Sequence, residues 1–477
     1  MTKGRPAPSS SMNRSQQSIA KRPNIGRHFD DIKKLRMDQN PSQDATLFTY
    51  TSGRWLHLDK PQRDARYVKF NFNQLCQKVL SLCPSATSIE SCEKVEGGFS
   101  KVFIMKMDNG RCVVVKFPMA VVGPAGYVTN SEVATVTYLQ RHTRIPIPAV
   151  LDWSDDPANP VGYPYIIMEH AGGVSLQELQ EHVLGLQWHD LSSYTSALID
   201  VGLARLPPPD HPLPLQQHAS YQGSISKHLS LLKTAQAIFP NLITHPSIHS
   251  NSTPTLFHPD LHKRNIFVLS KDNPTTITGF IDWQSTSIEP AFEYAHDVPD
   301  FARIPAESES DGTSEEYAEI SPRHLAYEVG WAIFAPRLGA TRHIDERLLR
   351  PFSYAHRTWR DGFVPFTTEL LRLREGWEEL GFQKSSPCPI PALSAEEEAV
   401  YKEQLEVYEK MVEFWRDMSG ELGVGGDGWV GVERWEGVRR AHARLFEMVM
   451  GNMEDERDRE DLRRMWPFDA WMCDMAD

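Results

Sequence analysis

The chain has 477 residues, of which 40% are hydrophobic and 24% charged, and its formal net charge is −13. This composition is typical of globular proteins with a sizeable core and excludes a disordered or collagen-like chain. The acidic excess argues against nucleic acid as the main partner, and no run of about 18 apolar residues is present that could form a transmembrane segment. The six cysteines lack the spacing of a zinc site, which indicates free thiols in a reducing compartment.

The chain begins with a basic segment, and we expect a disordered tail over residues 1–44. Residues 1–29 contain six Lys or Arg, five Ser and no acidic residue. This composition is typical of a mitochondrial transit peptide, but an ordinary basic tail has it as well. The sequence therefore leaves both a mitochondrial and a cytoplasmic location open.

Residues 45–170 are predicted to form a strand-rich, nucleotide-binding N-lobe. Asp108-Asn109-Gly110 predicts a hairpin turn, because Asn-Gly readily adopts positive φ angles. Apolar residues at helical spacing predict one strong helix over residues 131–141. Three short β-branched or aromatic segments are predicted as strands: 102–105, 113–115 and 165–168.

Residues 171–477 are predicted to form a helical C-lobe, interrupted by two short strands at 266–269 and 279–282. The last part, residues 391–477, carries 22 acidic and 11 basic residues and has a helical pattern, so we expect acidic helices with solvated faces. Strands first and helices later predict an α+β fold with two lobes. Pro-rich or acidic breaks are expected at 205–218, 305–316 and 384–391.

The chemistry is concentrated in residues 256–284. There, His258-x-Asp260 is followed by Asn265, and Asp282 stands at the end of the next hairpin. Asp260 is the candidate catalytic base, which would accept the proton of an attacking hydroxyl. Asn265 and Asp282 are the candidate Mg²⁺ ligands, since this cation prefers oxygen donors. Asp and Asn can also simply stabilise a turn, but this combination favours phosphoryl transfer.

Two charged residues upstream fit the same chemistry. Lys116 ends an apolar strand, where it could bind the α- and β-phosphates of ATP, and Glu132 opens the following helix, where it could pair with Lys116. Alone, Lys116 would be an ordinary strand-end lysine, and Glu132 would be an acid that interacts with the helix dipole.

Further candidate nucleotide contacts lie on either side of these residues. Glu96-Gly97-Gly98-Phe99-Ser100 places two glycines between strands, where the backbone could approach a phosphate, so Gly97, Gly98 and Ser100 are candidate nucleotide-binding residues. A plain hairpin turn explains the glycines as well. Glu169 follows an apolar strand and is expected in the segment that joins the lobes, where adenine would bind backbone groups.

From about residue 90 to 300 the chain resembles the aminoglycoside phosphotransferase/choline-kinase family, which has a protein-kinase-like fold. More narrowly, and over most of its length, it resembles the fungal altered inheritance of mitochondria phosphotransferase-like proteins. The segments that carry this narrower resemblance are Phe48-Thr49-Tyr50-Thr51-Ser52-Gly53-Arg54-Trp55, Ser131-Glu132-Val133-Ala134-Thr135, Ile145-Pro146-Ile147-Pro148, Asn159-Pro160-Val161-Gly162, Ile281-Asp282-Trp283-Gln284-Ser285-Thr286-Ser287 and Asp427-Gly428-Trp429-Val430.

The chain departs from the family at three positions. Pro259 and Arg264 stand where the family commonly has glycine in the catalytic loop. Glu293 stands where the family has an aspartate that supports this loop, and its side chain is one methylene longer. These departures put the loop conformation in doubt, because proline fixes φ and lacks an N–H.

The residues and the resemblance together predict an ATP- and Mg²⁺-dependent phosphotransferase, associated with mitochondria, that acts on a hydroxyl of a small molecule. A protein acceptor is disfavoured, because Asp282-Trp283-Gln284 stands where protein kinases have Asp-Phe-Gly. The alternative is a kinase-like adaptor or structural protein with weak or no catalysis, and the three departures motivate it. The acceptor and the oligomeric state are not predicted.

Overall fold

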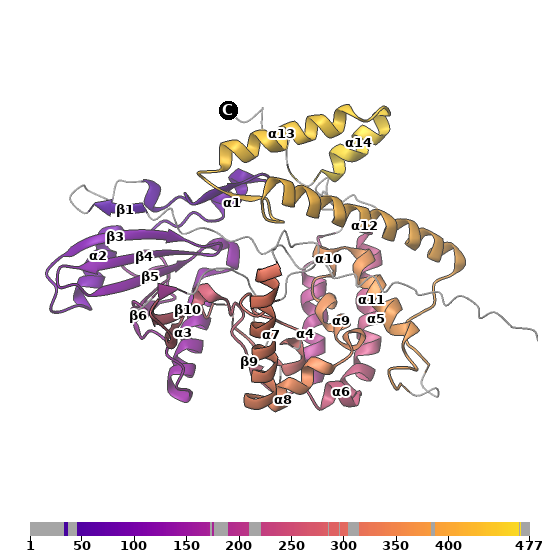
Figure 1. Cartoon of the computed structure of the whole chain (residues 1–477), viewed down its shortest axis with the longest axis horizontal. Helices are drawn as coiled ribbons and strands as arrows, with labels where there is room; N and C mark the ends of the chain where they lie inside the picture. Colours follow the sequence, from indigo (N-terminus) through magenta and orange to yellow (C-terminus); the bar gives the residue numbers. More distant parts are fainter. Residues whose placement is uncertain are drawn as a thin grey trace, which may run out of the picture.

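The computed structural model confirms an α+β fold with a β-rich lobe followed by a helical one (Figure 1). The large sheet lies at the left of Figure 1 and most helices lie at the right. Residues 1–29 lie outside the described part of the chain. The structure describes residues 33–36, 45–171, 174–175, 189–208, 221–284, 286–294, 296–303, 314–382, 387–466 and 468.

The N-lobe is built on a six-stranded antiparallel sheet with the strand order β1-β3-β4-β5-β7-β6. The three predicted strands and the hairpin are confirmed, and Gly110 has the positive φ of 82° that the turn requires. Strand β1 lies within the segment expected to be a disordered tail, so that expectation is wrong there. The strands are β1 (Lys33–Arg36), β3 (Ile89–Glu96), β4 (Ser100–Met107), β5 (Cys112–Pro118), β6 (Val150–Ser154) and β7 (Tyr165–Glu169).

Three helices accompany this sheet, whereas the sequence predicted one. They are α1 (Asp59–Asp64), α2 (Phe72–Ser81) and α3 (Ala125–His142). Phe72, Leu75 and Val79 bury one face of α2 in the core of the N-lobe, which explains why this segment is helical. The predicted helix is α3, and it begins earlier than expected, directly after Pro124.

The C-lobe is mainly helical, as predicted. Two predicted breaks are confirmed where they are described: α4 ends just before residues 205–208, and residues 387–391 are not helical. The expected loop at 305–316 is wrong at its end, because residues 314–316 belong to α7. The helices are α4 (Leu191–Ala204), α5 (Ile225–Thr244), α6 (Pro246–His249), α7 (Ser314–Phe334), α8 (Pro336–Gly339), α9 (Glu346–Ala355), α10 (Thr358–Asp361), α11 (Phe363–Glu375), α12 (Ala395–Leu422), α13 (Trp435–Gly451) and α14 (Glu456–Met465).

Small sheets complete the fold and position the candidate catalytic loop, residues 258–265. Strand β10 (Ile266–Ser270) pairs with β11 (Asn273–Phe280) and β8 (Val174–Ser175), while β9 (Pro254–Leu256) pairs with β12 (Ile288–Pro290). The strand predicted at 279–282 ends at Phe280, because the Ile281 carbonyl accepts a hydrogen bond from His258 and Asp282 adopts a φ of 63°.

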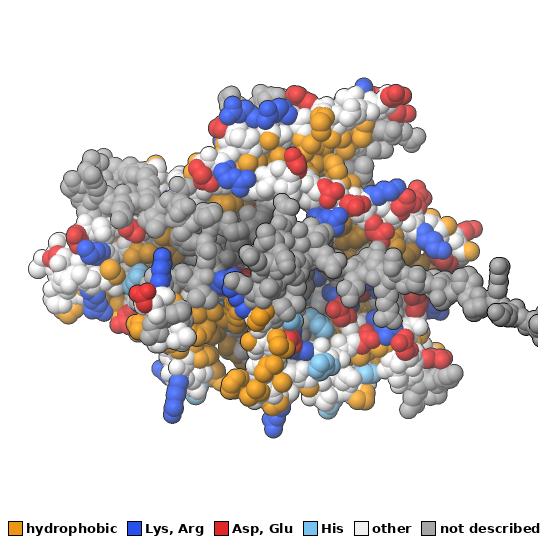
Figure 2. All heavy atoms as spheres, viewed as in Figure 1, with side chains coloured by type: hydrophobic (Ala, Val, Ile, Leu, Met, Phe, Trp, Pro, Cys, Tyr) orange, Lys and Arg blue, Asp and Glu red, His pale blue; other side chains and the backbone are white. Residues whose placement is uncertain are grey.

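The C-terminal helices cross the upper edge of the molecule in Figure 1, and a short strand leads back to the N-lobe. Strand β13 (Trp429–Gly431) pairs with β2 (Gly53–Trp55). Acidic and basic side chains are interspersed on the face drawn in Figure 2, and Lys402 and Lys410 of α12 pair with glutamates one turn away. Among the described helices, none is both long and apolar enough to cross a membrane.

Candidate functional site

The candidate catalytic loop runs from His258 to Asn265, between β9 and β10. His258 donates from Nε2 to the carbonyl of Ile281 at 2.8 Å, and its Nδ1 accepts from the backbone N–H of Asp260 at 3.2 Å. Burial lowers the pKa of His258, so its imidazole stays neutral near pH 7. His258 thus links the loop to the segment that carries Asp282, and both of its ring nitrogens are used in structural hydrogen bonds.

Asp260 is a buried carboxyl whose Oδ2 accepts hydrogen bonds, whereas Oδ1 has no hydrogen-bond partner among the described residues. Asn265 Nδ2 donates to Oδ2 and to the backbone carbonyl of Asp260, each at 2.8 Å. Arg264 also pairs with Oδ2, and His262 Nε2 lies 3.2 Å from Oδ1. Burial raises the pKa of Asp260 to about 8, although Arg264 favours the ionised form. This carboxylate accepts a proton more readily than an ordinary aspartate does, a property that suits a general base.

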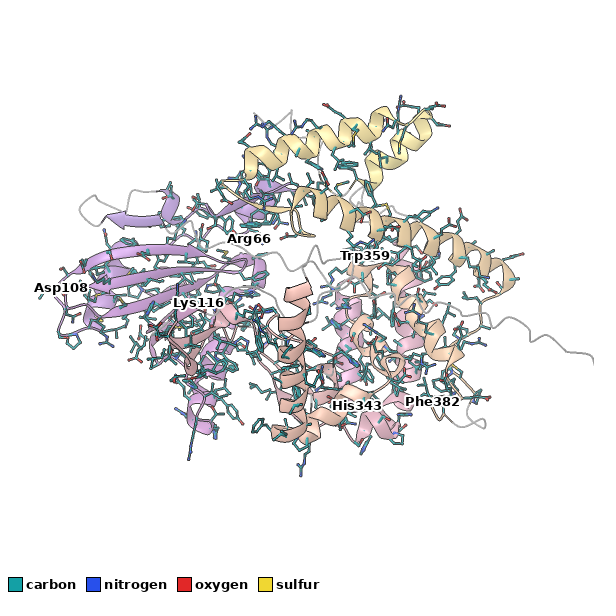
Figure 3. The ribbon with its side chains drawn as sticks, viewed as in Figure 1. Arg66, Asp108, Lys116, His343, Trp359 and Phe382 are labelled. Atoms are coloured by element: carbon teal, nitrogen blue, oxygen red, sulfur yellow. The ribbon has the colours of Figure 1, made fainter. Side chains whose placement is uncertain are left out.

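Lys116 joins two carboxylates at the end of the sheet that faces the helical lobe (Figure 3). Its Nζ lies 2.7 Å from Glu132 Oε1 and 2.7 Å from Asp282 Oδ1. Burial opposes the charged form of Lys116, but the two carboxylates outweigh it and raise the pKa. Burial also disfavours ionised Asp282, but Lys116 lowers its pKa, whereas burial prevails at Glu132 and raises its pKa.

The position of Glu132 in α3 corrects the sequence analysis. We expected Glu132 to open the helix, but α3 begins at Ala125, so Glu132 lies well inside it and is buried. Interaction with the helix dipole falls off within the first turn, and it therefore does not explain this carboxylate. Its contact with Lys116 does explain it.

Asn265 and Asp282 offer oxygen atoms of the kind that Mg²⁺ binds. The Nδ2 atom of Asn265 is occupied by Asp260, so the amide atom that remains is the oxygen, and the carboxylate of Asp282 is 39% exposed. Their chain segments adjoin, because Ile281 N–H donates to the Asn265 carbonyl at 3.0 Å. Within the described residues, no cluster of three or more His, Cys, Asp or Glu could hold a metal. Mg²⁺ commonly uses one or two protein ligands with phosphate and water, which fits this set.

The glycine-containing turn lies between β3 and β4, as predicted. Gly97 N–H donates to the Ser100 carbonyl at 3.0 Å, and Ser100 is the first residue of β4. The carbonyl of Gly98 accepts a hydrogen bond of 2.9 Å from Arg66, which the sequence did not single out.

Glu169 lies apart from the charged cluster. It is the last residue of β7, and its side chain is exposed. Its backbone N–H donates to the carbonyl of Ala149 at 2.9 Å. Because this N–H already has a partner within the protein, the backbone carbonyl of Glu169 is the group that could contact adenine.

Asp300 supports the catalytic loop at the place where the resemblance led us to expect Glu293. Asp300 Oδ1 accepts from the backbone N–H of Lys263 at 3.2 Å and lies 3.4 Å from His262 Nδ1. Glu293 instead accepts a hydrogen bond of 2.8 Å from the hydroxyl of Tyr194 in α4. No sequence signal pointed to Asp300, because it lies outside every motif.

Comparison with known proteins agrees with this arrangement. Residues 91–311 match the model of the phosphotransferase enzyme family. The resemblance to these phosphotransferases is confirmed. The matched region contains the glycine turn, the Lys116 cluster and the whole catalytic loop, and it agrees with the extent expected from the motifs.

Fungal relatives match shorter parts of the chain. A subtelomeric hrmA-associated cluster protein of Aspergillus fumigatus is 44% identical over 94 residues, which are 20% of this chain and 18% of that protein. The mitochondrial altered inheritance of mitochondria protein 9 of Yarrowia lipolytica is 25% identical over 154 residues, covering 29% of this chain and 26% of that protein. These matches span about a quarter or less of the relatives' lengths and less of this chain than the motifs suggested.

Among solved structures, the aminoglycoside phosphotransferase APH(3'')-Id of Streptomyces rimosus is similar to this chain. The match covers 62% of this chain and 98% of that structure's chain. The sequences are 17% identical and the TM-score is 0.28. At this level the similarity says nothing about the substrate of this chain.

Proposed function

We propose that the protein is an ATP- and Mg²⁺-dependent phosphotransferase that acts on a hydroxyl group of a small molecule. The observation that carries the proposal is the contact of Lys116, from the β-rich lobe, with Asp282, which follows the catalytic loop of the other lobe. Two regions far apart in the sequence thus place their charged groups in one site. The family match over residues 91–311 supports the same reaction class.

In this proposal Lys116 holds the phosphates of ATP, and Glu132 keeps the ammonium group in place. A lysine at 2.7 Å from two carboxylates is oriented before the nucleotide arrives, so little ordering is left to do on binding. Phosphate oxygens would then take the place of Asp282 beside Lys116. Asp282 and the Oδ1 atom of Asn265 would hold Mg²⁺, which when bound neutralises charge on the β- and γ-phosphates.

Asp260 is the proposed general base. Its pKa of about 8 suits removal of a proton from an acceptor hydroxyl near neutral pH. The Asp260 side chain is only 8% exposed and Arg264 covers Oδ2, so the acceptor must approach as Arg264 or His262 moves aside. If Arg264 and His262 both stay in place, no acceptor reaches Asp260, and the protein would act as a kinase-like adaptor without catalysis.

We also propose a mitochondrial location. The support is the basic, serine-containing composition of residues 1–29 and the mitochondrial name of the Yarrowia lipolytica relative. A fluorescent fusion at the C-terminus, imaged beside a mitochondrial marker, tests it. A diffuse signal that does not overlap the marker would contradict this location.

Phosphate transfer from labelled ATP to a panel of hydroxyl metabolites tests the reaction. With the full chain and Mg²⁺ we expect transfer to at least one metabolite, and Asp260→Asn should lower turnover by about 100-fold or more, because the amide cannot accept the proton. Asp417→Asn, at an exposed ion pair in α12, is the matched control and should retain activity. Mg·ATP binding without transfer to any acceptor would favour the adaptor alternative.

A further inference from the structure

The glycine turn is tied to the segment that precedes the sheet. Glu96, just before the turn, accepts hydrogen bonds on Oε2 from the backbone N–H of Thr51 at 2.7 Å and from its hydroxyl at 3.0 Å. Lys101, just after the turn, donates to the carbonyl of Thr49 at 3.1 Å. Both side chains are fully buried, and Lys101 lies 3.4 Å from Glu96. The two ends of the turn therefore share one buried anchor.

The tip of the turn has its own anchor, Arg66. This residue is 4% exposed, and its Nε donates to the Gly98 carbonyl at 2.9 Å, while Nη1 donates to the carbonyl of Gln62 at 2.8 Å. In Figure 3 Arg66 lies toward the same end of the sheet as Lys116, opposite to Asp108. Because the C=O and N–H of a trans peptide point in opposite directions, holding the Gly98 carbonyl also fixes the direction of the next N–H.

Arg66 is in turn held by a tryptophan. Its guanidinium lies 4.3 Å from the centre of the Trp55 ring, a distance at which the positive charge is attracted to the ring face. Trp55 is the last residue of β2 and is 1% exposed. The orientation of Arg66 therefore depends on how β2 is held.

Strand β2 is held by residues 427–431, which lie far from it in the sequence. Trp55 Nε1 donates to Asp427 Oδ2 at 3.3 Å, and Asp427 Oδ1 accepts from the N–H of Trp429 at 3.1 Å. Trp429 pairs with Trp55 across β2 and β13. A methyl group on Gly53 would lie 2.5 Å from the Trp429 ring, so the two strands pack closely.

We propose that residues 48–66 and 427–431 form a support that sets the conformation of the glycine turn, and that Arg66 is a positioning residue for the nucleotide. The nucleotide part of this inference rests on the proposed function. A binding loop that is held rigidly before binding loses less conformational freedom when the ligand arrives. In this proposal the Asp427-Gly428-Trp429 segment supports the glycine turn, although it lies far from the turn in the sequence.

Two measurements on the full-length protein test the proposal: amide hydrogen exchange of the peptide that contains residues 96–101, and Mg·ATP binding by calorimetry. Arg66→Lys keeps the charge but removes the Nε–H and the planar stacking group. We expect exchange in this peptide and the Kd for Mg·ATP each to rise about tenfold, because a hydrogen bond from a charged donor is lost. Arg416→Lys, at an exposed position of α12 outside the support, is the control and should change neither quantity.

Asp427→Asn tests the distant end of the support by weakening the contact with Trp55. It should increase exchange at residues 96–101 while strands β6 and β7 keep their wild-type exchange. Wild-type exchange at residues 96–101 in both variants would overturn the proposal. If the wild-type protein bound no Mg·ATP, the proposed function and the nucleotide part would fail, whereas the exchange data would still decide whether Arg66 holds the turn.

Discussion

Lys116 is the residue on which the charge balance of the site depends. Its side chain is 8% exposed and contacts two carboxylates, of which the Glu132 side chain is 5% exposed. Removing one partner from a buried ion pair leaves the other charge without compensation, which costs more than the pair itself contributes. Lys116 therefore stabilises the fold in addition to its proposed role in ATP binding.

Replacing Lys116 by Met separates these two roles. Lys116→Met should lower the free energy of unfolding by about 3–5 kcal/mol, because Glu132 stays buried without its partner. Lys116→Met combined with Glu132→Gln should regain most of that stability but not Mg·ATP binding. Urea denaturation and calorimetric titration of both variants measure the two effects. Equal stability of wild type and Lys116→Met would contradict the buried pair.

Glu293 links stability to pH. Burial raises its pKa to about 7, with Tyr194 acting in the opposite direction and Glu289 adding to the rise. Below the ordinary value of about 4.5 both the folded and the unfolded chain carry the proton. As the pH rises toward 7 the unfolded chain ionises while the folded one keeps its proton, so folding becomes less favourable.

Glu293→Gln should remove this contribution, because the amide stays neutral and its oxygen can still accept from Tyr194. We expect the variant to gain up to about 3 kcal/mol in free energy of unfolding relative to wild type at pH 8, and little at pH 4. Glu421→Gln, at an exposed position of α12, is the control and should show no such difference. A pH-independent effect of Glu293→Gln would contradict the raised pKa.

At the scale of elements, the pairing of β2 with β13 depends on a close approach at Gly53. A Cβ there would lie 2.5 Å from the Trp429 ring and 2.6 Å from the Val430 carbonyl. Gly53→Ala should therefore destabilise the protein by about 1–3 kcal/mol. Gly330→Ala, in α7 with no atom within 4 Å of the new methyl group, should be neutral or stabilising. Thermal unfolding of the two variants compares their stabilities. Equal stability would show that β2 and β13 can move apart at Gly53 without a loss of free energy.

Local sequence signals predicted the elements better than their ends. The Asn109-Gly110 turn and the strands beside it were predictable, because turn chemistry and β-branched residues act over a few positions. The start of α3 and the end of β11 were not predicted correctly. Contacts distant in the sequence decide the end of β11, since His258 takes the Ile281 carbonyl out of the strand ladder.

At the scale of the whole molecule, the site is formed by segments that lie far apart in the sequence. The motif order predicted Lys116, Glu132 and Asp282 in one site, with Glu132 as the partner of Lys116. The structure brings both carboxylates into contact with Lys116. The roles of these residues stay predictions. Asp300 and Arg66 could not be predicted, because their contacts with the loop and the turn arise from packing and leave no pattern in spacing or composition.

Segments that lie far apart in the sequence also meet outside the site, because β13 pairs with β2. A separate buried hydrophobic cluster joins Leu56 to residues of α12, α13 and α14. The helices after residue 391 therefore contribute to the core beside the N-lobe, in addition to carrying many of the acidic residues.

Calorimetric titration of the full-length protein with ATP, with and without Mg²⁺, tests the central claim most directly. We expect saturable binding at one site that requires Mg²⁺. Asp282→Asn should lose the Mg²⁺ dependence, since asparagine tolerates the φ of 63° but lacks the charge. The absence of saturable binding, or unchanged Mg²⁺-dependent binding in Asp282→Asn, would contradict the site described here.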